Sequence, residues 1–335
     1  MKKHLFAFVG FFAVLGIFNL FIYSGKKDPI NPVRGGGVVP EKYHVFAVDI
    51  PKELSFAGEK VPLNDFDVRE RIDREMQVNV YWQSQTLLMI KRANRWFPIM
   101  EPILKKNNIP DDVKFIALTE SGLTNVISPS GATGFWQFMD PTARSYGMVI
   151  TGDVDERYNV EKSTEAACKY FQEAYNTFGN WTLAAASYNM GIGGVQAQLQ
   201  NQRVKSYYDL LLNEETFRYI ARLLAIKEVI SSPSKYGFEY RKTDLYPQLP
   251  TYTVSVDSSI NDLVSFAEHF KMTYKTLKVL NPWLRQTYLS NGYGKRYEIA
   301  ILREGFVYPE DEDVNIPTPP VITTPKDTTT KTPKK

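Results

Sequence analysis

The sequence predicts a mainly α-helical protein with a smaller α+β module towards its C-terminus. Residues 80–232 carry apolar side chains at helical spacing, with no competing strand alternation. The pattern changes after the segment YPQLP, where two alternating stretches flank two short helical ones. A length of 335 residues is enough for one sizeable domain with smaller attachments, and 43% hydrophobic and 23% charged residues are ordinary for a globular protein.

The N-terminal segment predicts export from the cytoplasm. After the positively charged start MKKH, residues 5–23 form an apolar run interrupted only by Asn19. This run is close to the ~20 residues that span a bilayer and is longer than a typical signal-peptide core. We therefore favour a signal anchor over a cleaved signal peptide for residues 1–24. Residues 25–65 show no sustained periodicity and predict a linker.

Helical patterns then dominate a predicted domain at residues 66–245. The helices expected from apolar spacing and from Gly or Pro stops are two within 76–108, joined near Asn94–Trp96, and one each at 163–178, 181–190 and 213–231. Gly179 and Pro233 are the predicted stops of the third and the last of these segments.

The predicted module covers residues 250–305. Its expected order is strand, helix, helix, strand, at residues 251–256, 261–270, 274–281 and 295–302. Residues 310–335 are rich in Pro, Thr and Lys and predict a disordered tail.

Composition excludes several kinds of chemistry. The single cysteine, Cys168, rules out an intramolecular disulfide and a cysteine-based metal cluster. With only three histidines, neither a His-ligated metal nor a Ser-His-Asp triad is expected, and we predict no metal and no cofactor. Forty Lys and Arg against 37 Asp and Glu give a net charge of +3 without a dense basic run, so nucleic acid is not an expected partner. The remaining candidates for chemistry are carboxylates.

Glu120 is the carboxylate whose position attracts attention. In the segment IPDDVKFIALTES, Val113, Ile116, Ala117 and Glu120 lie on one helical face, which is the apolar one. Burial disfavours the charged form, so the pKa of Glu120 should rise, as a general acid for a glycosidic oxygen requires. A second interpretation stays open, in which Glu120 ends the helix and accepts hydrogen bonds from the next loop.

The segments around Glu120 suggest a sugar-binding cleft. SGATGFWQFMDPTARSYG contains three glycines, which allow close approach of backbone to a ligand, and the Trp136–Gln137 pair offers an apolar surface beside an amide. AAASYNMGIGG repeats this arrangement with Tyr188 and Asn189. Core packing explains Trp136 equally well, because large aromatic residues dominate cores.

Four segments in order carry a family resemblance: ALTESG, GATGFWQFMDPTARSYG, AAASYNMGIGG and ETFRYIARLLAI. They resemble the motifs of the soluble lytic transglycosylase family, and most of all its membrane-bound D branch, over about residues 80–230. The resemblance implies a lysozyme-like helical catalytic domain of the goose type. One departure is Asp140, which stands where the family more often has proline, with Pro141 following.

The resemblance also implies a site and a reaction. Glu120 matches the single catalytic acid/base. Together with Trp136 from the residue pattern, the expected substrate-binding residues are Ser121, Gly134, Gln137, Tyr188, Asn189 and Tyr219. The implied substrate is the glycan strand of peptidoglycan, cleaved without water to a 1,6-anhydro end. The implied location is the periplasm, with the N-terminal segment in the inner membrane. No protein partner is implied.

Two other functions stay open, namely a hydrolytic muramidase on the same fold and a non-catalytic peptidoglycan-binding or scaffold protein. The module resembles a LysM repeat through FAEHFKMTYKTLKVLNP, although Asp257 and Ser258 stand where the repeat usually has Gly-Asp. Either glycan binding or a structural appendage is consistent with this module.

Overall fold

The computed structural model describes residues 45–292 and 294–308. The predicted anchor at 1–24 and tail at 310–335 lie outside these residues. Within the described part, no helix has the length and apolar character to cross a membrane. The described residues from Val48 to Tyr308 belong to one compact unit, which contains all the elements described below.

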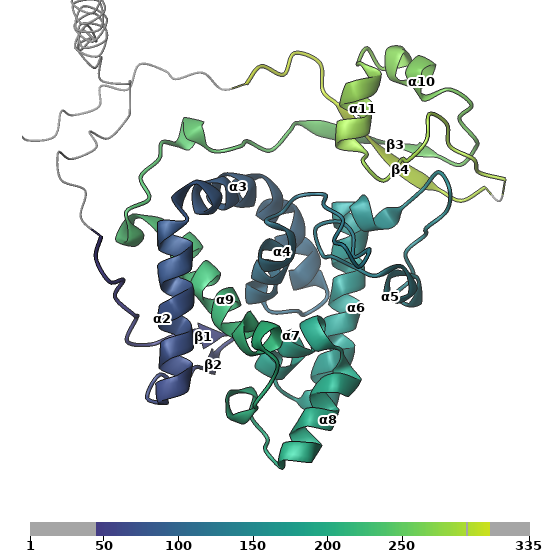
Figure 1. Cartoon of the computed structure of the whole chain (residues 1–335). Coiled ribbons are helices and arrows are strands. Elements are labelled where there is room, and N and C mark those ends of the chain that lie inside the picture. Colours follow the sequence, from purple (N-terminus) through teal and green to yellow (C-terminus); the bar gives the residue numbers. More distant parts are fainter. Residues whose placement is uncertain (1–44, 293, 309–335) are drawn as a thin grey trace, which may run out of the picture. The chain divides into compact units, whose positions relative to one another are not determined.

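The first part of this unit is helical, as predicted (Figure 1). Its α-helices are α2 (Phe66–Tyr81), α3 (Gln83–Lys106), α4 (Lys114–Ser121), α5 (Asp140–Ser145), α6 (Val160–Phe178), α7 (Trp181–Met190), α8 (Ile192–Gln202) and α9 (Glu214–Ser231). Short 3₁₀ turns lie between these helices or follow the last of them: η1 (Asp111–Val113), η2 (Glu156–Tyr158), η3 (Tyr207–Asp209), η4 (Pro233–Tyr236) and η5 (Lys242–Asp244).

Local signals set the ends of several helices. The side chain of Asn159 accepts from the backbone N–H of Lys162 at the start of α6, and Asn213 plays the same part at the start of α9. Gly179 ends α6 in the left-handed conformation, with φ 62°. Helix α9 ends two residues before Pro233. These two predicted stops are confirmed.

The predicted break at Asn94–Trp96 is wrong. The chain breaks instead at Trp82, between α2 and α3, and α3 continues through Pro98 and Pro102. Each proline removes one intrahelical hydrogen bond, which favours a helix end. The helix persists because its inner face is packed in the core, with buried residues that include Ala93, Phe97, Met100 and Leu104. Tertiary packing thus overrides the local preference.

Residues 48–65 are not a linker in this structure, contrary to expectation. Strand β1 (Ser55–Phe56) pairs with β2 (Glu59–Lys60), and the side chains buried around this hairpin are Leu54, Phe56, Val61 and Leu63. The carboxylate of Glu59 accepts the backbone N–H groups of Trp181 and Thr182 at 2.5 and 2.8 Å. These groups open α7 and have no partner inside the helix, so Glu59 satisfies them and fixes the hairpin.

The C-terminal module has the predicted order of elements (Figure 1). Strand β3 (Thr251–Val256) pairs antiparallel with β4 (Tyr297–Leu302), and α10 (Leu263–His269) and α11 (Tyr274–Leu280) lie between them in the sequence. A separate apolar core fills the module, with Leu263, Ala267, Leu277, Ile299 and Ile301 fully buried. The mainly helical fold with a small α+β module is therefore confirmed.

A buried carboxylate joins α2 to α9. Glu75 on α2 is 1% exposed, and its Oε1 lies 2.7 Å from Nε of Arg218 and 2.6 Å from a guanidinium nitrogen of Arg74. Arg222 lies farther away, at 3.9 Å. Three guanidinium groups therefore surround one carboxylate, and its removal would leave them with no negative partner at that place.

We expect Glu75→Ala to lower the free energy of unfolding by about 3 kcal/mol, the usual cost of removing one partner of a buried ion pair. Urea unfolding followed by circular dichroism measures this change. The control is Glu70→Ala on the exposed face of the same helix, which should stay within about 0.5 kcal/mol of the unchanged protein. Equal losses in the two variants would contradict the assigned role of Glu75.

Candidate active site

Glu120 lies in the last turn of α4. This helix ends at Gly122, whose φ of 60° is left-handed and whose N–H donates to the carbonyl of Leu118. Val113, Ile116 and Ala117 on the same face are 0% exposed. Glu120 itself is half-buried, because it sits where the apolar face reaches the surface. The carboxyl group is thus desolvated by its neighbours and yet accessible to a ligand.

Tyr219 on α9 holds the carboxyl group. Its hydroxyl donates to Oε1 of Glu120 at 2.6 Å, and its side chain is 2% exposed. Burial raises the pKa of Glu120, while the hydrogen bond from Tyr219 and the positive charge of Arg222 act in the opposite direction; the net pKa is raised. Burial also raises the pKa of Tyr219 well above its usual range, so this hydroxyl stays a donor.

Sequence reasoning missed two charged residues that act on Glu120. Arg222 lowers the pKa of Glu120, and Glu215 raises it. On α9, Glu215 lies four residues before Tyr219 and Arg222 lies three residues after it, which places both on the same helical face as this tyrosine. The sequence could have predicted both residues, because those at i−4 and i+3 from a residue that contacts the carboxyl group lie on the same face of the helix.

Ser121 and Gly134 build the loop next to Glu120. The Ser121 hydroxyl donates to the carbonyls of Ala117 at 3.0 Å and of Phe135 at 2.8 Å. Gly134 has φ 82°, and a Cβ atom there would lie 2.0 Å from the carbonyl oxygen of Arg157. No side chain fits in that space. Both residues therefore join the loop to its surroundings.

Trp136 belongs to the core, which corrects the expectation that it lines a sugar site. Its side chain is 0% exposed, and Nε1 donates to Oγ1 of Thr164 on α6 at 2.9 Å. Its ring contacts Phe171 and Tyr188 at tilted and edge-on angles. A fully buried indole has no face to offer a sugar ring, so the core interpretation left open from the sequence holds.

Gln137 and Tyr188 both bond to the backbone of the loop that follows Glu120. Gln137 has φ 49°, and its Nε2 donates to the carbonyls of Val126 at 3.0 Å and Gly134 at 2.7 Å. The Tyr188 hydroxyl donates to the carbonyl of Trp136 at 2.6 Å. Gln137 is half-buried, and its amide nitrogen is committed to holding its own loop. What it can offer a ligand is its Oε1 acceptor.

Asn189 is tied to α9. Its Oδ1 accepts from Oγ1 of Thr216 at 2.8 Å, and the side chain is half-buried. Thr216 precedes Tyr219 by three residues, so the structure brings Asn189 to the same helix that carries the partner of Glu120. The amide nitrogen of Asn189 is the group that it can still offer a ligand.

The Asp140–Pro141 pair begins helix α5. Asp140 is the first residue of the helix and Pro141 the second, a position where proline needs no partner for a missing N–H. Oδ1 of Asp140 lies 2.5 Å from Nε of Arg144 one turn later, and this contact lowers the pKa of Asp140. The departure from the family pattern thus forms an ordinary helix start.

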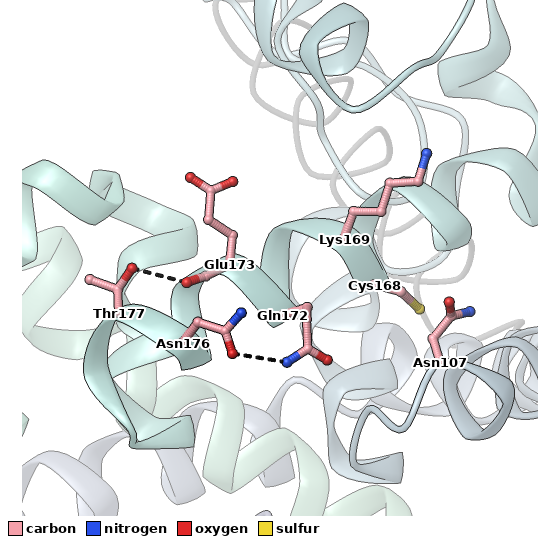
Figure 2. Close-up of a pocket in the computed structure, with 7 residues that line it drawn as sticks. All are labelled: Asn107, Cys168, Lys169, Gln172, Glu173, Asn176 and Thr177. Carbon is pink, nitrogen blue, oxygen red and sulfur yellow. Dashed lines mark hydrogen bonds between the residues drawn. The ribbon is translucent and has the colours of Figure 1, made fainter.

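Two cavities lie away from Glu120. One of about 520 Å³ is lined by Asn107 and by polar residues of α6 around Cys168 (Figure 2). Burial raises the pKa of the Cys168 thiol to about 12, so it is not a reactive thiolate. The other, of about 320 Å³, involves Trp283 and Tyr297 of the module. Neither is lined by a predicted site residue. Among the described residues, no cluster of His, Cys, Asp or Glu could hold a metal ion.

The raised pKa of Glu120 predicts a pH-dependent gain in stability for Glu120→Gln. Below the unfolded value of about 4.5, the carboxyl group is protonated in both states and the two proteins should be equally stable. As the pH rises, Glu120 ionises first in the unfolded chain. The free energy of unfolding of the unchanged protein therefore falls by about 1.4 kcal/mol for each unit by which folding raises the pKa of Glu120. Urea unfolding at pH 4 and pH 8 measures this difference.

The control for that experiment is Glu70→Gln, which removes one charge from the exposed face of α2. If Glu120→Gln raised the free energy of unfolding by the same amount at pH 4 and at pH 8, burial of the charged carboxylate would not be the cause of the gain.

Comparison with known proteins finds two family models that match parts of the chain. Residues 97–211 match the model for the transglycosylase SLT domain. Residues 252–312 match the model for the soluble lytic transglycosylase C-terminal LysM-like domain. Glu120 and the loop at 131–138 fall inside the first match, whereas Tyr219 lies beyond its end.

Similar proteins include membrane-bound lytic murein transglycosylase D from two Escherichia coli strains, K12 and O6:H1. Each is 29% identical over 190 residues, which is 55% of this chain and 41% of the relative, so the match spans well under half of these relatives. Similar solved structures include the 70 kDa soluble lytic transglycosylase Slt70 from Escherichia coli, with 22% identity, 50% of this chain and 33% of that chain covered, and a TM-score of 0.37.

A lytic transglycosylase Slt from Pseudomonas aeruginosa has 20% identity, 45% and 26% coverage and a TM-score of 0.35. Neither TM-score is high enough to carry a conclusion about this chain. The two family matches agree with the fold: the helical region is similar to the transglycosylase SLT domain, and the following module is similar to the LysM-like domain found at the C-terminus of soluble lytic transglycosylases.

Proposed function

We propose that this protein is a peptidoglycan lytic transglycosylase in which Glu120 is the single general acid and base. The observation that carries the proposal is the state of this carboxyl group, which is half-buried, has a raised pKa and receives a hydrogen bond from Tyr219. The SLT match and the name of the similar murein transglycosylases support the choice of peptidoglycan as substrate.

The two carboxyl oxygens of Glu120 have different roles in this proposal. Tyr219 occupies Oε1, so Oε2 carries the proton and donates it to the glycosidic oxygen. Burial raises the pKa of Glu120 and so favours the protonated form of the carboxyl group, which a general acid needs. The bond between C1 of N-acetylmuramic acid and the oxygen of N-acetylglucosamine then breaks, and the proton leaves with that oxygen.

The substrate supplies its own nucleophiles. The 2-acetamido carbonyl oxygen bonds to C1 as the leaving group departs. The C6 hydroxyl then attacks C1 and displaces the acetamido oxygen, while its proton passes to the Glu120 carboxylate. The product is a 1,6-anhydro end, Glu120 is again protonated, and no water is consumed. One carboxyl group is sufficient because it gives a proton in the first step and receives one in the second.

A hydrolytic muramidase would need a second carboxylate to activate water or attack C1. Glu215 is a candidate, because it is the carboxylate that acts on the pKa of Glu120. It is exposed and lies at the start of α9, where no hydrogen bond orients it among the contacts of the described residues. The substrate-assisted route does not use Glu215, and this difference separates the two reactions.

Further parts of the proposal concern binding and location. Gln137 and Asn189 contact the sugar through the Oε1 acceptor and the amide nitrogen described above, next to Glu120. The location is the cell envelope, in keeping with the membrane-bound relatives, with residues 1–24 as the anchor or signal peptide. A catalytically silent glycan-binding protein is the alternative, and release of anhydro-muropeptides from sacculi would exclude it.

Glu120→Gln is expected to reduce the release of anhydro-muropeptides from purified sacculi by about 10³-fold or more, because it removes the proton donor and acceptor of the reaction. Mass spectrometry identifies the product, since a hydrolytic product is one water heavier. The matched control is Glu215→Gln, which should keep activity within about threefold. Loss of activity in the Glu215 variant, or a hydrated product from the unchanged protein, would favour the muramidase.

The pH profile tests the assigned role of Tyr219. A general acid must be protonated, so kcat/KM should fall as the pH rises through the pKa of Glu120. The hydrogen bond from Tyr219 lowers this pKa, and Tyr219→Phe should therefore move the descending limb to higher pH while reducing the maximum rate about tenfold.

The control for the pH profile is Tyr207→Phe. Tyr207 is also buried, and its hydroxyl donates to the carbonyl of Thr216, without contact to Glu120. Its loss removes a comparable buried hydroxyl but should leave the limb in place. A limb that stays fixed or moves to lower pH in the Tyr219 variant would contradict the proposed acid role.

A further inference from the structure

Residues 151–158, between α5 and α6, carry hydrogen bonds between the helical domain and the C-terminal module. The backbone N–H of Asp155 donates to the carbonyl of Trp283 at 2.9 Å, and the N–H of Arg285 donates to the carbonyl of Asp153 at 2.7 Å. The Asp153 carboxylate also accepts the N–H of Ser290 at 2.6 Å. These bonds continue the antiparallel bridge between Val154 and Leu284.

Apolar contact strengthens this joint. Val154 and Tyr158 are 0% and 7% exposed, and they belong to the apolar core of the module and not to that of the helical domain. The guanidinium group of Arg285 lies over the ring of Tyr158, 4.1 Å from its centroid. The segment is therefore part of the module by packing, although it belongs to the helical domain by sequence.

The same segment holds the loop next to Glu120. The Asp155 carboxylate binds the guanidinium group of Arg157 at two points, 3.0 Å from Nε and 2.7 Å from a terminal nitrogen. The remaining nitrogen of Arg157 donates to the carbonyls of Gly131 and Phe138, each at 3.2 Å. One planar group thus ties the two ends of the loop 131–138 to each other and to Asp155.

The loop in turn meets the helix of Glu120. Its carbonyl at Phe135 accepts from Ser121, the neighbour of Glu120, and its carbonyl at Trp136 accepts from Tyr188. At its middle, Gly134 packs so closely on the backbone of Arg157 that no Cβ atom fits. A continuous series of contacts therefore runs from the module through Asp155 and Arg157 to the residue beside the catalytic carboxyl group.

We propose that Arg157 is a positioning residue, through which the docked C-terminal module holds the loop 131–138 in register with Glu120. The activity measurement that tests this proposal rests on the proposed function, whereas the hydrogen-exchange measurement does not. Arginine is required because its side chain bonds Asp155 at two points and still reaches two carbonyls, which a lysine ammonium on a flexible stem does not reproduce. The module then acts on catalysis without contacting the substrate at Glu120.

The test compares Arg157→Lys with Arg296→Lys in the full chain. Arg296 is a matched control because it is an arginine of the module that pairs with Glu298 at the surface and is 73% exposed. Hydrogen exchange of the amides in residues 131–138 is the readout that does not depend on activity. We expect at least a tenfold faster exchange there in Arg157→Lys, with the exchange of α9 amides unchanged.

The activity arm measures kcat and KM on purified sacculi. We expect kcat of Arg157→Lys to fall roughly 10- to 100-fold with KM within about threefold, because the loop is misplaced and not lost. A second variant, Asp153→Ala, removes the acceptor of Ser290 and loosens the module without touching the loop. Asp153→Ala should also speed the hydrogen exchange of the amides in residues 131–138. In the double variant, the effects of Asp153→Ala and Arg157→Lys on this exchange should be less than additive.

Three outcomes would overturn the proposal. These are unchanged exchange in residues 131–138 in Arg157→Lys, exchange that increases equally across the whole chain, and full additivity of Asp153→Ala with Arg157→Lys. If the unchanged protein releases no anhydro-muropeptide, the proposed function fails instead, and the exchange measurements still decide the role of Arg157.

Discussion

The hydrogen bond between Tyr219 and Glu120 is the interaction on which the site depends. A carboxyl group at the edge of an apolar face has two unfavourable extremes, since full exposure would return its pKa to the ordinary range and full burial would close it to substrate. Tyr219 allows an intermediate position, because it satisfies one carboxyl oxygen from inside the protein. Helix α9 must then be fixed relative to α4, and the ion pair of Arg218 with Glu75 on α2 helps to fix it.

Three of the predicted binding residues make their contacts within the protein. Ser121, Gly134 and Trp136 all lie in segments that the sequence marks as functional, but their side-chain or Cβ contacts are with the protein itself. This is a physical consequence of placing a carboxyl group beside irregular backbone. The loop has carbonyl and N–H groups that need partners, and the residues that satisfy them are as restricted in type as a catalytic group.

How much could be predicted from the sequence depends on the range of the forces involved. The ends of α6 and α9 follow from Gly179 and Pro233, which act within a few residues, and these predictions are confirmed. The continuation of α3 through Pro98 depends on packing against distant helices, so the local signal is misleading. The core role of residues 48–65 depends on Glu59 meeting the start of α7, more than a hundred residues away, and no periodicity reports such a contact. By contrast, helical spacing from Tyr219 does predict that Glu215 and Arg222 lie on the same face of α9.

The joint at residues 151–158 changes how the module should be regarded. A tethered binding module would keep its own core and leave the helical domain complete without it. Here Val154 and Tyr158 complete the module's core, so separating the two parts would expose apolar surface on both. Asp155 bonds to both sides of this joint, because its backbone N–H donates to the module and its side chain holds Arg157. Separation of the module would remove the first of these bonds. Any displacement of the module is therefore transmitted to the loop beside Glu120, whether or not the module itself binds glycan.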